Sequence, residues 1–98
     1  MEAPTVVRKR VVVSGTVQGV FFRDTCRRVA LAQGVVGWVR NLPDRRVEAV
    51  FEGADGPVQR LVDWARHGPE QATVAHLDIH DEQPEGLSGF TIRETPRA

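Results

Sequence analysis

The sequence contains a single cysteine, no excess of positive or negative charge, and no long hydrophobic segment. One cysteine excludes an internal disulfide and any C-x-x-C motif for metal or redox chemistry. The 13 basic and 13 acidic side chains cancel, so no net charge marks a nucleic-acid or membrane-surface binder. No apolar run approaches the roughly 18 residues of a membrane-spanning helix, and no signal-peptide pattern is present. We therefore expect a soluble, cytoplasmic, monomeric protein with neither a membrane nor a nucleic-acid partner.

The length of 98 residues fits one domain over residues 1–98, with a single hydrophobic core. Alternating and helical hydrophobic patterns divide this domain into strands and helices. Strands are predicted over 6–14, 35–41, 47–51, 72–83 and 90–93, helices over 22–33 and from Pro57 to just before Gly68, and a loop over 53–56. The order β-α-β-β-α-β, followed by a short closing strand, predicts the α+β class, as a ferredoxin-like sandwich of an antiparallel sheet with two helices on one face.

A segment with two glycines, Gly15–Arg23, joins the first predicted strand to the first predicted helix. Successive N–H groups in such a turn can surround an anion, and the helix dipole favours negative charge at this end of a helix. The planar guanidinium of Arg23 adds donors that suit a phosphate or a carboxylate. The segment therefore predicts an oxyanion site, with phosphate as the preferred ligand. The alternative is an ordinary strand-to-helix turn with a solvated arginine.

This segment does not match the better-known phosphate motifs. No Lys-Ser or Lys-Thr follows the second glycine, as a P-loop requires, and the glycines lack G-x-G-x-x-G spacing. A cysteine-dependent phosphatase carries its nucleophile six residues before the arginine, where this chain has Val17. Cys26 follows Arg23 on the apolar face of the predicted helix, so we interpret it as a buried structural thiol.

The predicted topology brings a second polar residue close to this segment. The first two strands flank a helical crossover, so they run parallel, with the third strand expected between them. Their C-terminal ends therefore lie on the same edge of the sheet. The segment leaves the first strand at this edge and Asn41 ends the second strand, so Arg23 and Asn41 can face one pocket.

Two histidines, His76 and His80, lie on one face of the fourth predicted strand, and the apolar Ala75, Leu77 and Ile79 lie on the other. This alternation predicts a half-buried strand. On a strand the two histidines are roughly 13 Å apart, too far to share a metal ion. No group of His, Cys, Asp or Glu residues has ligand spacing near the oxyanion segment, so we expect neither a metal nor another cofactor.

At these residues the chain resembles the acylphosphatase family. The matching residues are Gly15–Arg23, Gly37-Trp38-Val39-Arg40-Asn41, Gly53, Trp64, His67-Gly68-Pro69, Ala72, Val74 and Phe90-Thr91-Ile92-Arg93. The resemblance covers nearly the whole chain at the spacing of that family. It implies an acid-anhydride hydrolase that cleaves the carboxyl-phosphate bond of small acylphosphates. The products would be a carboxylate and inorganic phosphate, formed without a metal.

The resemblance also implies roles for particular residues. Arg23 would bind the phosphoryl group together with the loop residues, and Asn41 would position the attacking water. Inorganic phosphate would be both the product and a competitive inhibitor. Two departures from the family are Arg45, where members usually carry glycine, and a slightly longer tail after Arg93. The phosphate-binding set implied is Thr16, Val17, Gln18, Gly19, Val20, Phe21, Phe22 and Arg23.

The oxyanion segment contains neither a nucleophile nor a dedicated base. This absence suits direct attack by water on a substrate with a good leaving group, such as a carboxylate. In a loose phosphoryl-transfer transition state the main requirement is to stabilise charge on the equatorial oxygens, which the segment and Arg23 can do. Asn41 can orient water but cannot deprotonate it, so the substrate phosphate is our hypothesis for the proton acceptor.

Other functions are compatible with a fold of this kind. An RNA-recognition module would display aromatic residues on its central strands, but the first strand has none and the third only Phe51. A metal chaperone would need paired cysteines. A regulatory domain that binds a small anion without turnover stays open, because an anion site alone does not distinguish binding from hydrolysis.

Overall fold

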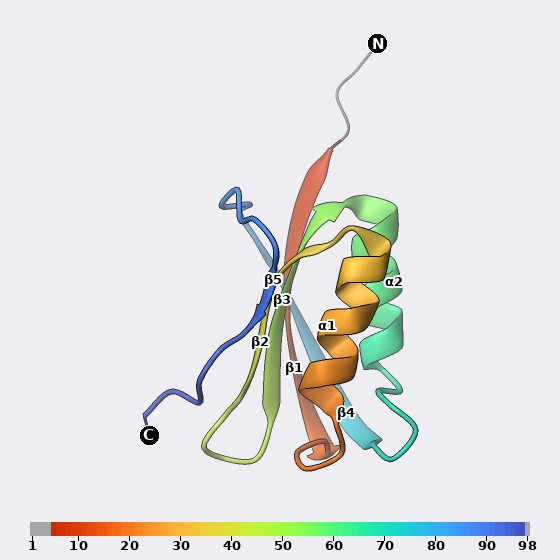
Figure 1. Cartoon of the computed structure of the whole chain (residues 1–98), viewed down its shortest axis with the longest axis vertical. Coiled ribbons are helices and arrows are strands. Elements are labelled where there is room, and N and C mark those ends of the chain that lie inside the picture. Colours follow the sequence, from red (N-terminus) through yellow and green to blue (C-terminus); the bar gives the residue numbers. More distant parts are fainter. Residues whose placement is uncertain (1–4, 98) are drawn as a thin grey trace.

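The computed structural model describes residues 5–97, which form two helices and five strands (Figure 1). In chain order these are β1 (Val6–Thr16), α1 (Phe22–Gln33), β2 (Val36–Asn41), β3 (Val47–Ala54), α2 (Asp55–Ala65), β4 (Thr73–Glu82) and β5 (Phe90–Ile92). The predicted order of elements is confirmed, and α1 has the predicted bounds. Within the described residues, neither helix is long and apolar enough to cross a membrane.

Helix α2 begins earlier than predicted, and the loop expected at 53–56 is wrong. Strand β3 continues through Gly53 to Ala54, because β1 is long enough to pair with both residues. Helix α2 then starts at Asp55, whose carboxylate lies in the first turn, where the helix dipole favours negative charge. Pro57 is tolerated as the third helical residue, since N–H groups of the first turn have no partner within a helix.

The five strands form one sheet in the order β4-β1-β3-β2-β5. Strand β3 pairs antiparallel with β1 and β2, so those two strands run parallel to each other with β3 between them, as predicted. Strand β4 is antiparallel to β1, and the chain reverses direction before β5. Strand β5 therefore runs parallel to β2, and the sheet is antiparallel as predicted except at this edge.

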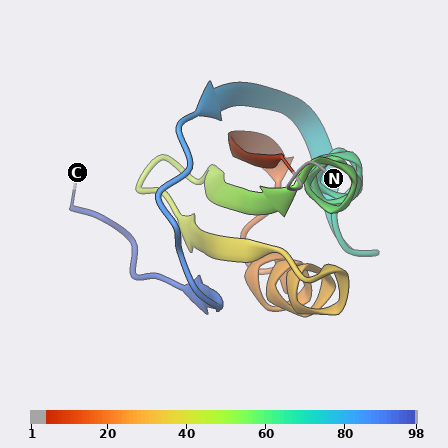
Figure 2. The same cartoon turned by 90° about the horizontal axis from the view of Figure 1, so that it is seen from above.

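Both helices cover the same face of the sheet (Figure 2). The core between the sheet and the helices contains Val11, Val13, Val17, Phe22, Cys26, Ala30, Val35, Val39, Val47, Ala49, Phe51, Val58, Leu61, Val62, Ala65 and Phe90. Trp64 packs at the edge of this core, with its ring centroid 5.1 Å from that of Phe22. Cys26 is fully buried, and burial raises the pKa of its thiol, which confirms its interpretation as a structural residue.

The uncovered face of the sheet carries ion pairs around the buried Glu52. Its carboxylate accepts hydrogen bonds of 2.9–3.0 Å from the backbone N–H groups of Glu85, Gly86 and Leu87, and lies 3.5 Å from the Arg8 guanidinium. Burial alone would raise the pKa of Glu52, but these donors outweigh burial and hold the pKa below its usual range. The contacts fix the segment between β4 and β5 against the sheet, so they help to place β5 beside β2.

Strand β4 forms the other edge of the sheet and is more exposed than predicted. Leu77 is half-buried, whereas Ala75 and Ile79, expected on the buried face, are exposed. The reason is that α2 packs over β1 and β3 and leaves the edge strand uncovered. His76 Nε2 lies 3.0 Å from Asp78 Oδ1 on this exposed strand. Within residues 5–97, no three His, Cys, Asp or Glu side chains form a group that could hold a metal ion.

The turn between β2 and β3 places Arg45 in the left-handed region, with φ of 76°. For a residue other than glycine this conformation costs roughly 1–2 kcal/mol. Glycine would remove that cost. It would also increase the conformational entropy of the unfolded chain, which lowers the free energy of unfolding by about 0.4–1 kcal/mol. We therefore expect Arg45→Gly to stabilise the protein by no more than about 1 kcal/mol. Denaturant midpoints of the two proteins measure this, and a clear loss of stability would contradict it.

Candidate active site

The loop between β1 and α1 begins at a bulge in the sheet. The pairing of β1 with β4 shifts register between Ser14 and Gly15, where Gly15 has φ of 123°. A Cβ atom at Gly15 would overlap the backbone carbonyl of Thr73, so only glycine fits at this position. The bulge lets β1 end at Thr16 and turns the chain towards the sheet edge on which β2 also ends.

The loop enters α1 through two residues with positive φ. Gly19 has φ of 75°, and Phe21 has φ of 63° and forms the N-cap without a side-chain hydrogen bond. The Thr25 N–H donates to the Phe21 carbonyl, which is the first backbone hydrogen bond of the helix. The earlier N–H groups have no capping side chain, so they are available to an anion at the positive end of the helix dipole.

Beside this helix end lies a cavity of about 350 Å³, which we call the Arg23 cavity. Arg23 comes from the first turn of α1 and Asn41 from the end of β2, and both line the cavity. Its lining residues are Val17, Gly19, Phe21, Phe22, Arg23, Asp24, Asn41 and Ile92. The fold thus brings the two polar residues singled out in the sequence to one cavity. Ile92, from β5, is a lining residue that the sequence did not indicate.

The remaining residues of the implied phosphate-binding set lie around two other cavities. Thr16 and Gln18 line a cavity of about 420 Å³ together with Gly15, Val17, Gly19 and Arg45, which we call the Arg45 cavity. Val20 lines neither of these cavities. It borders a third cavity, of about 310 Å³, on the far side of Phe21 next to Pro69.

The side chain of Gln18 connects the β1–α1 loop to the β2–β3 turn. Its Nε2 donates hydrogen bonds of 3.0 Å to the backbone carbonyls of Leu42 and Arg46. Leu42 directly follows Asn41, and its own N–H donates to the Arg46 carbonyl. The loop that precedes Arg23 is therefore held against the turn that follows Asn41. The resemblance placed Gln18 in the implied phosphate-binding set, but no local pattern in the sequence reveals these carbonyl partners.

Arg23 is the cation of the Arg23 cavity. Its half-buried side chain forms no ion pair among residues 5–97. Asp24 also lines the cavity, but its carboxylate lies 3.1 Å from Arg28 Nη2, one turn further along α1. The positive charge of Arg23 is thus not neutralised by its neighbour, and it adds to the field of the helix end.

Asn41 retains unused hydrogen-bonding capacity at the wall of the Arg23 cavity. Its Oδ1 atom is buried and has no hydrogen-bond partner among the described residues. A buried polar group without a partner costs about 1–3 kcal/mol. Strand pairing fixes the backbone of Asn41 opposite Val47, so the side chain is held at this wall by the sheet. An amide in this position is suited to hold a water or an oxygen atom of a substrate.

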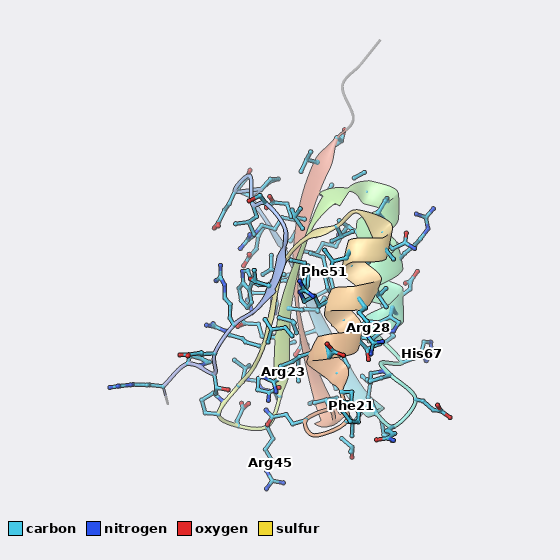
Figure 3. All side chains as sticks on the ribbon, in the orientation of Figure 1. Phe21, Arg23, Arg28, Arg45, Phe51 and His67 are labelled. Carbon is cyan, nitrogen blue, oxygen red and sulfur yellow. The ribbon has the colours of Figure 1, made fainter. Side chains whose placement is uncertain are left out.

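Apart from Asp24, the side chains that could act as nucleophile or base lie outside the Arg23 cavity. His67 lies on the α2 side of the molecule, away from Arg23 (Figure 3), and His76 and His80 lie on the exposed edge strand β4. The thiol of Cys26 is buried on the core-facing side of α1. Among the lining residues the one carboxylate is that of Asp24, which is ion-paired. The site therefore provides a cation, N–H donors and an amide.

Fold and site together define an α+β protein with two helices on one sheet face and a cavity, lined by Arg23 and Asn41, where β1 and β2 end. The family model for acylphosphatases matches residues 9–92. The acylphosphatase of Gloeobacter violaceus is 58% identical over 88 residues, which cover 90% of this chain and 95% of that protein. The acylphosphatase of Haloarcula marismortui is 52% identical over 86 residues, covering 88% and 94% respectively.

Among solved structures, that of an acylphosphatase from Coxiella burnetii superposes with a TM-score of 0.86 at 38% identity. The match covers 90% of this chain and 93% of the Coxiella chain. The chain therefore belongs to the acylphosphatase family. It is an enzyme, and its reaction is the hydrolysis of acylphosphates.

Proposed function

We propose that the Arg23 cavity is the active site and that it hydrolyses small acylphosphates by direct attack of water on phosphorus. One observation carries this proposal: Arg23 and Asn41, from different elements, line one cavity at the uncapped N-terminus of α1. The cation and the helix end suit the phosphoryl group, and the amide suits the water. Each component of the reaction then has a separate place in the site.

The phosphoryl group is held by Arg23 and by backbone N–H groups of residues 16–22. A guanidinium presents two parallel N–H donors to two oxygens of a phosphate, which fixes orientation as well as charge. The N–H groups at the helix end contribute further donors without any side-chain rearrangement. Inorganic phosphate carries the same oxygens, so it should compete with the substrate for this site.

The attacking water is positioned by the side-chain amide of Asn41. As the water oxygen forms its bond to phosphorus, the bond between phosphorus and the acyl oxygen breaks, and the carboxylate leaves with the electron pair. An amide cannot accept the proton of the water, so a phosphoryl oxygen of the substrate accepts it. Because a carboxylate is a good leaving group, the loose transition state needs charge stabilisation more than it needs a strong base.

An anion-binding domain without turnover would share the cation and the helix end. The test is phosphate release from benzoyl phosphate, measured against the uncatalysed rate in the same buffer. We expect release well above that rate, with saturation in substrate and competition by inorganic phosphate. Phosphate binding without accelerated release would overturn the proposed function.

We expect activity to survive removal of divalent cations. The charge-stabilising groups of the proposed mechanism are a guanidinium and backbone N–H groups, so no step requires a metal. Dialysis against EDTA, followed by assay in metal-free buffer, should leave kcat/KM for benzoyl phosphate unchanged. Loss of activity that is restored only by added Mg²⁺ or Zn²⁺ would contradict this mechanism.

A further inference from the structure

Arg45 has an unusual combination of backbone conformation and side-chain environment. It is one of two residues other than glycine with positive φ in the described part of the chain, and the other is Phe21 in the β1–α1 loop. Its side chain is exposed and forms no ion pair or hydrogen bond within residues 5–97. The neighbouring Arg46, in contrast, is held by Asp44 at 2.7 Å. The turn thus presents one bound and one available guanidinium.

Arg45 borders the Arg45 cavity, which shares lining residues with the proposed active site. Val17 and Gly19 line both the Arg23 cavity and the Arg45 cavity, so the two cavities are neighbours at this part of the loop. Arg45 lies at the same end of the molecule as Arg23 (Figure 3). The two hydrogen bonds of Gln18 tie the loop to the turn, which fixes the backbone of Arg45 relative to the loop.

The cavity next to the proposed phosphoryl position offers a place for the acyl group of the substrate. In an in-line displacement the leaving oxygen lies opposite the attacking water. The water is placed by Asn41, which lines the Arg23 cavity but not the Arg45 cavity. An acyl group that extends from the phosphoryl group past Val17 and Gly19 enters the space bordered by Arg45.

We propose that Arg45 determines acyl-group specificity by binding a carboxylate on the acyl portion of the substrate. The preferred substrates are then monoacylphosphates of dicarboxylic acids, with the phosphoryl group at Arg23 and the distal carboxylate at Arg45. A guanidinium matches a carboxylate through two parallel hydrogen bonds. This inference rests on the proposed function, because it extends the same site.

The test compares succinyl phosphate with butanoyl phosphate, which have chains of equal length that end in a carboxylate or a methyl group. The ratio of their kcat/KM values is measured for the wild type, Arg45→Asn, Arg45→Lys and Arg46→Gln. Asparagine tolerates the left-handed conformation and removes the charge. Lysine keeps the charge, and Arg46→Gln removes a charge from the same turn outside the cavity. Circular dichroism and denaturant midpoints confirm that each variant is folded.

We expect Arg45→Asn to lower the succinyl-to-butanoyl ratio about two- to fivefold, the range of an exposed ion pair. The change should lie in KM, since the carboxylate is bound equally in ground and transition states. The change in the ratio should diminish at high salt, and it should be smaller in Arg45→Lys than in Arg45→Asn. An unchanged ratio in Arg45→Asn, or an equal fall of the ratio in Arg46→Gln, would overturn the inference. Continued hydrolysis of butanoyl phosphate would show that the proposed function itself still holds. Failure of the wild type to hydrolyse either substrate would instead overturn the proposed function.

Discussion

Arg23→Ala is expected to lose substrate binding and turnover together, with kcat/KM lower by about 10³ or more. The guanidinium is the one charged group at the proposed phosphoryl position that no neighbouring carboxylate neutralises within the described residues. It interacts with the phosphoryl oxygens in the bound substrate and in the transition state, so its removal affects both. Steady-state kinetics with benzoyl phosphate, together with competition by inorganic phosphate, measure the two losses.

A matched control for Arg23→Ala is Arg60→Ala. Arg60 is exposed on α2 and hydrogen-bonded to Gln33, and it lines none of the three cavities described above. Its replacement should leave kcat/KM close to the wild-type value. Arg23→Lys keeps the charge but loses the planar fork, so its activity should fall between those of the wild type and Arg23→Ala. Near-normal kcat/KM in Arg23→Ala would show that another group holds the phosphoryl group.

Asn41→Ala is expected to lose on the order of 10² or more in kcat, the scale of removing one well-placed polar group from a catalytic site. Its affinity for inorganic phosphate should stay close to that of the wild type, because the amide contacts the water rather than the bound anion. The variant should also fold normally. Removing a buried oxygen that has no partner sacrifices no hydrogen bond, so the free energy of unfolding should not fall by more than about 1 kcal/mol.

Two results would contradict the role proposed for Asn41. If phosphate affinity collapsed while turnover at saturation survived, Asn41 would be a binding residue and the water would be positioned by another group. If the denaturant midpoint fell sharply, the loss of activity would reflect disruption of the β2–β3 turn. In that case the lower kcat would not test whether Asn41 positions the attacking water.

The elements that local patterns specify were predicted well from the sequence. The apolar face of α1 and the glycine that ends it fix both bounds of that helix. A right-handed crossover between parallel strands then places the ends of β1 and β2 on one edge, which brings Arg23 and Asn41 to one cavity.

The features that depend on distant partners could not be predicted. The three residues of β5 carry no signal for the strand beside which they lie, so Ile92 was not recognised as a cavity residue. Its position depends partly on Glu52, which binds backbone N–H groups more than 30 residues away in sequence. The link from Gln18 to the β2–β3 turn likewise depends on two backbone carbonyls. Any polar side chain of suitable length could make such contacts, so sequence does not identify them.

The most direct test of the proposed site is to measure kcat and the inhibition constant for inorganic phosphate on the same preparations of wild type, Arg23→Ala and Asn41→Ala. If Arg23 binds the phosphate and Asn41 positions the water, Arg23→Ala should strongly weaken inhibition by phosphate. Asn41→Ala should then lower kcat at least about a hundredfold with little change in phosphate inhibition. If the two variants lost phosphate affinity and turnover in the same proportion, the division of roles between Arg23 and Asn41 would be contradicted.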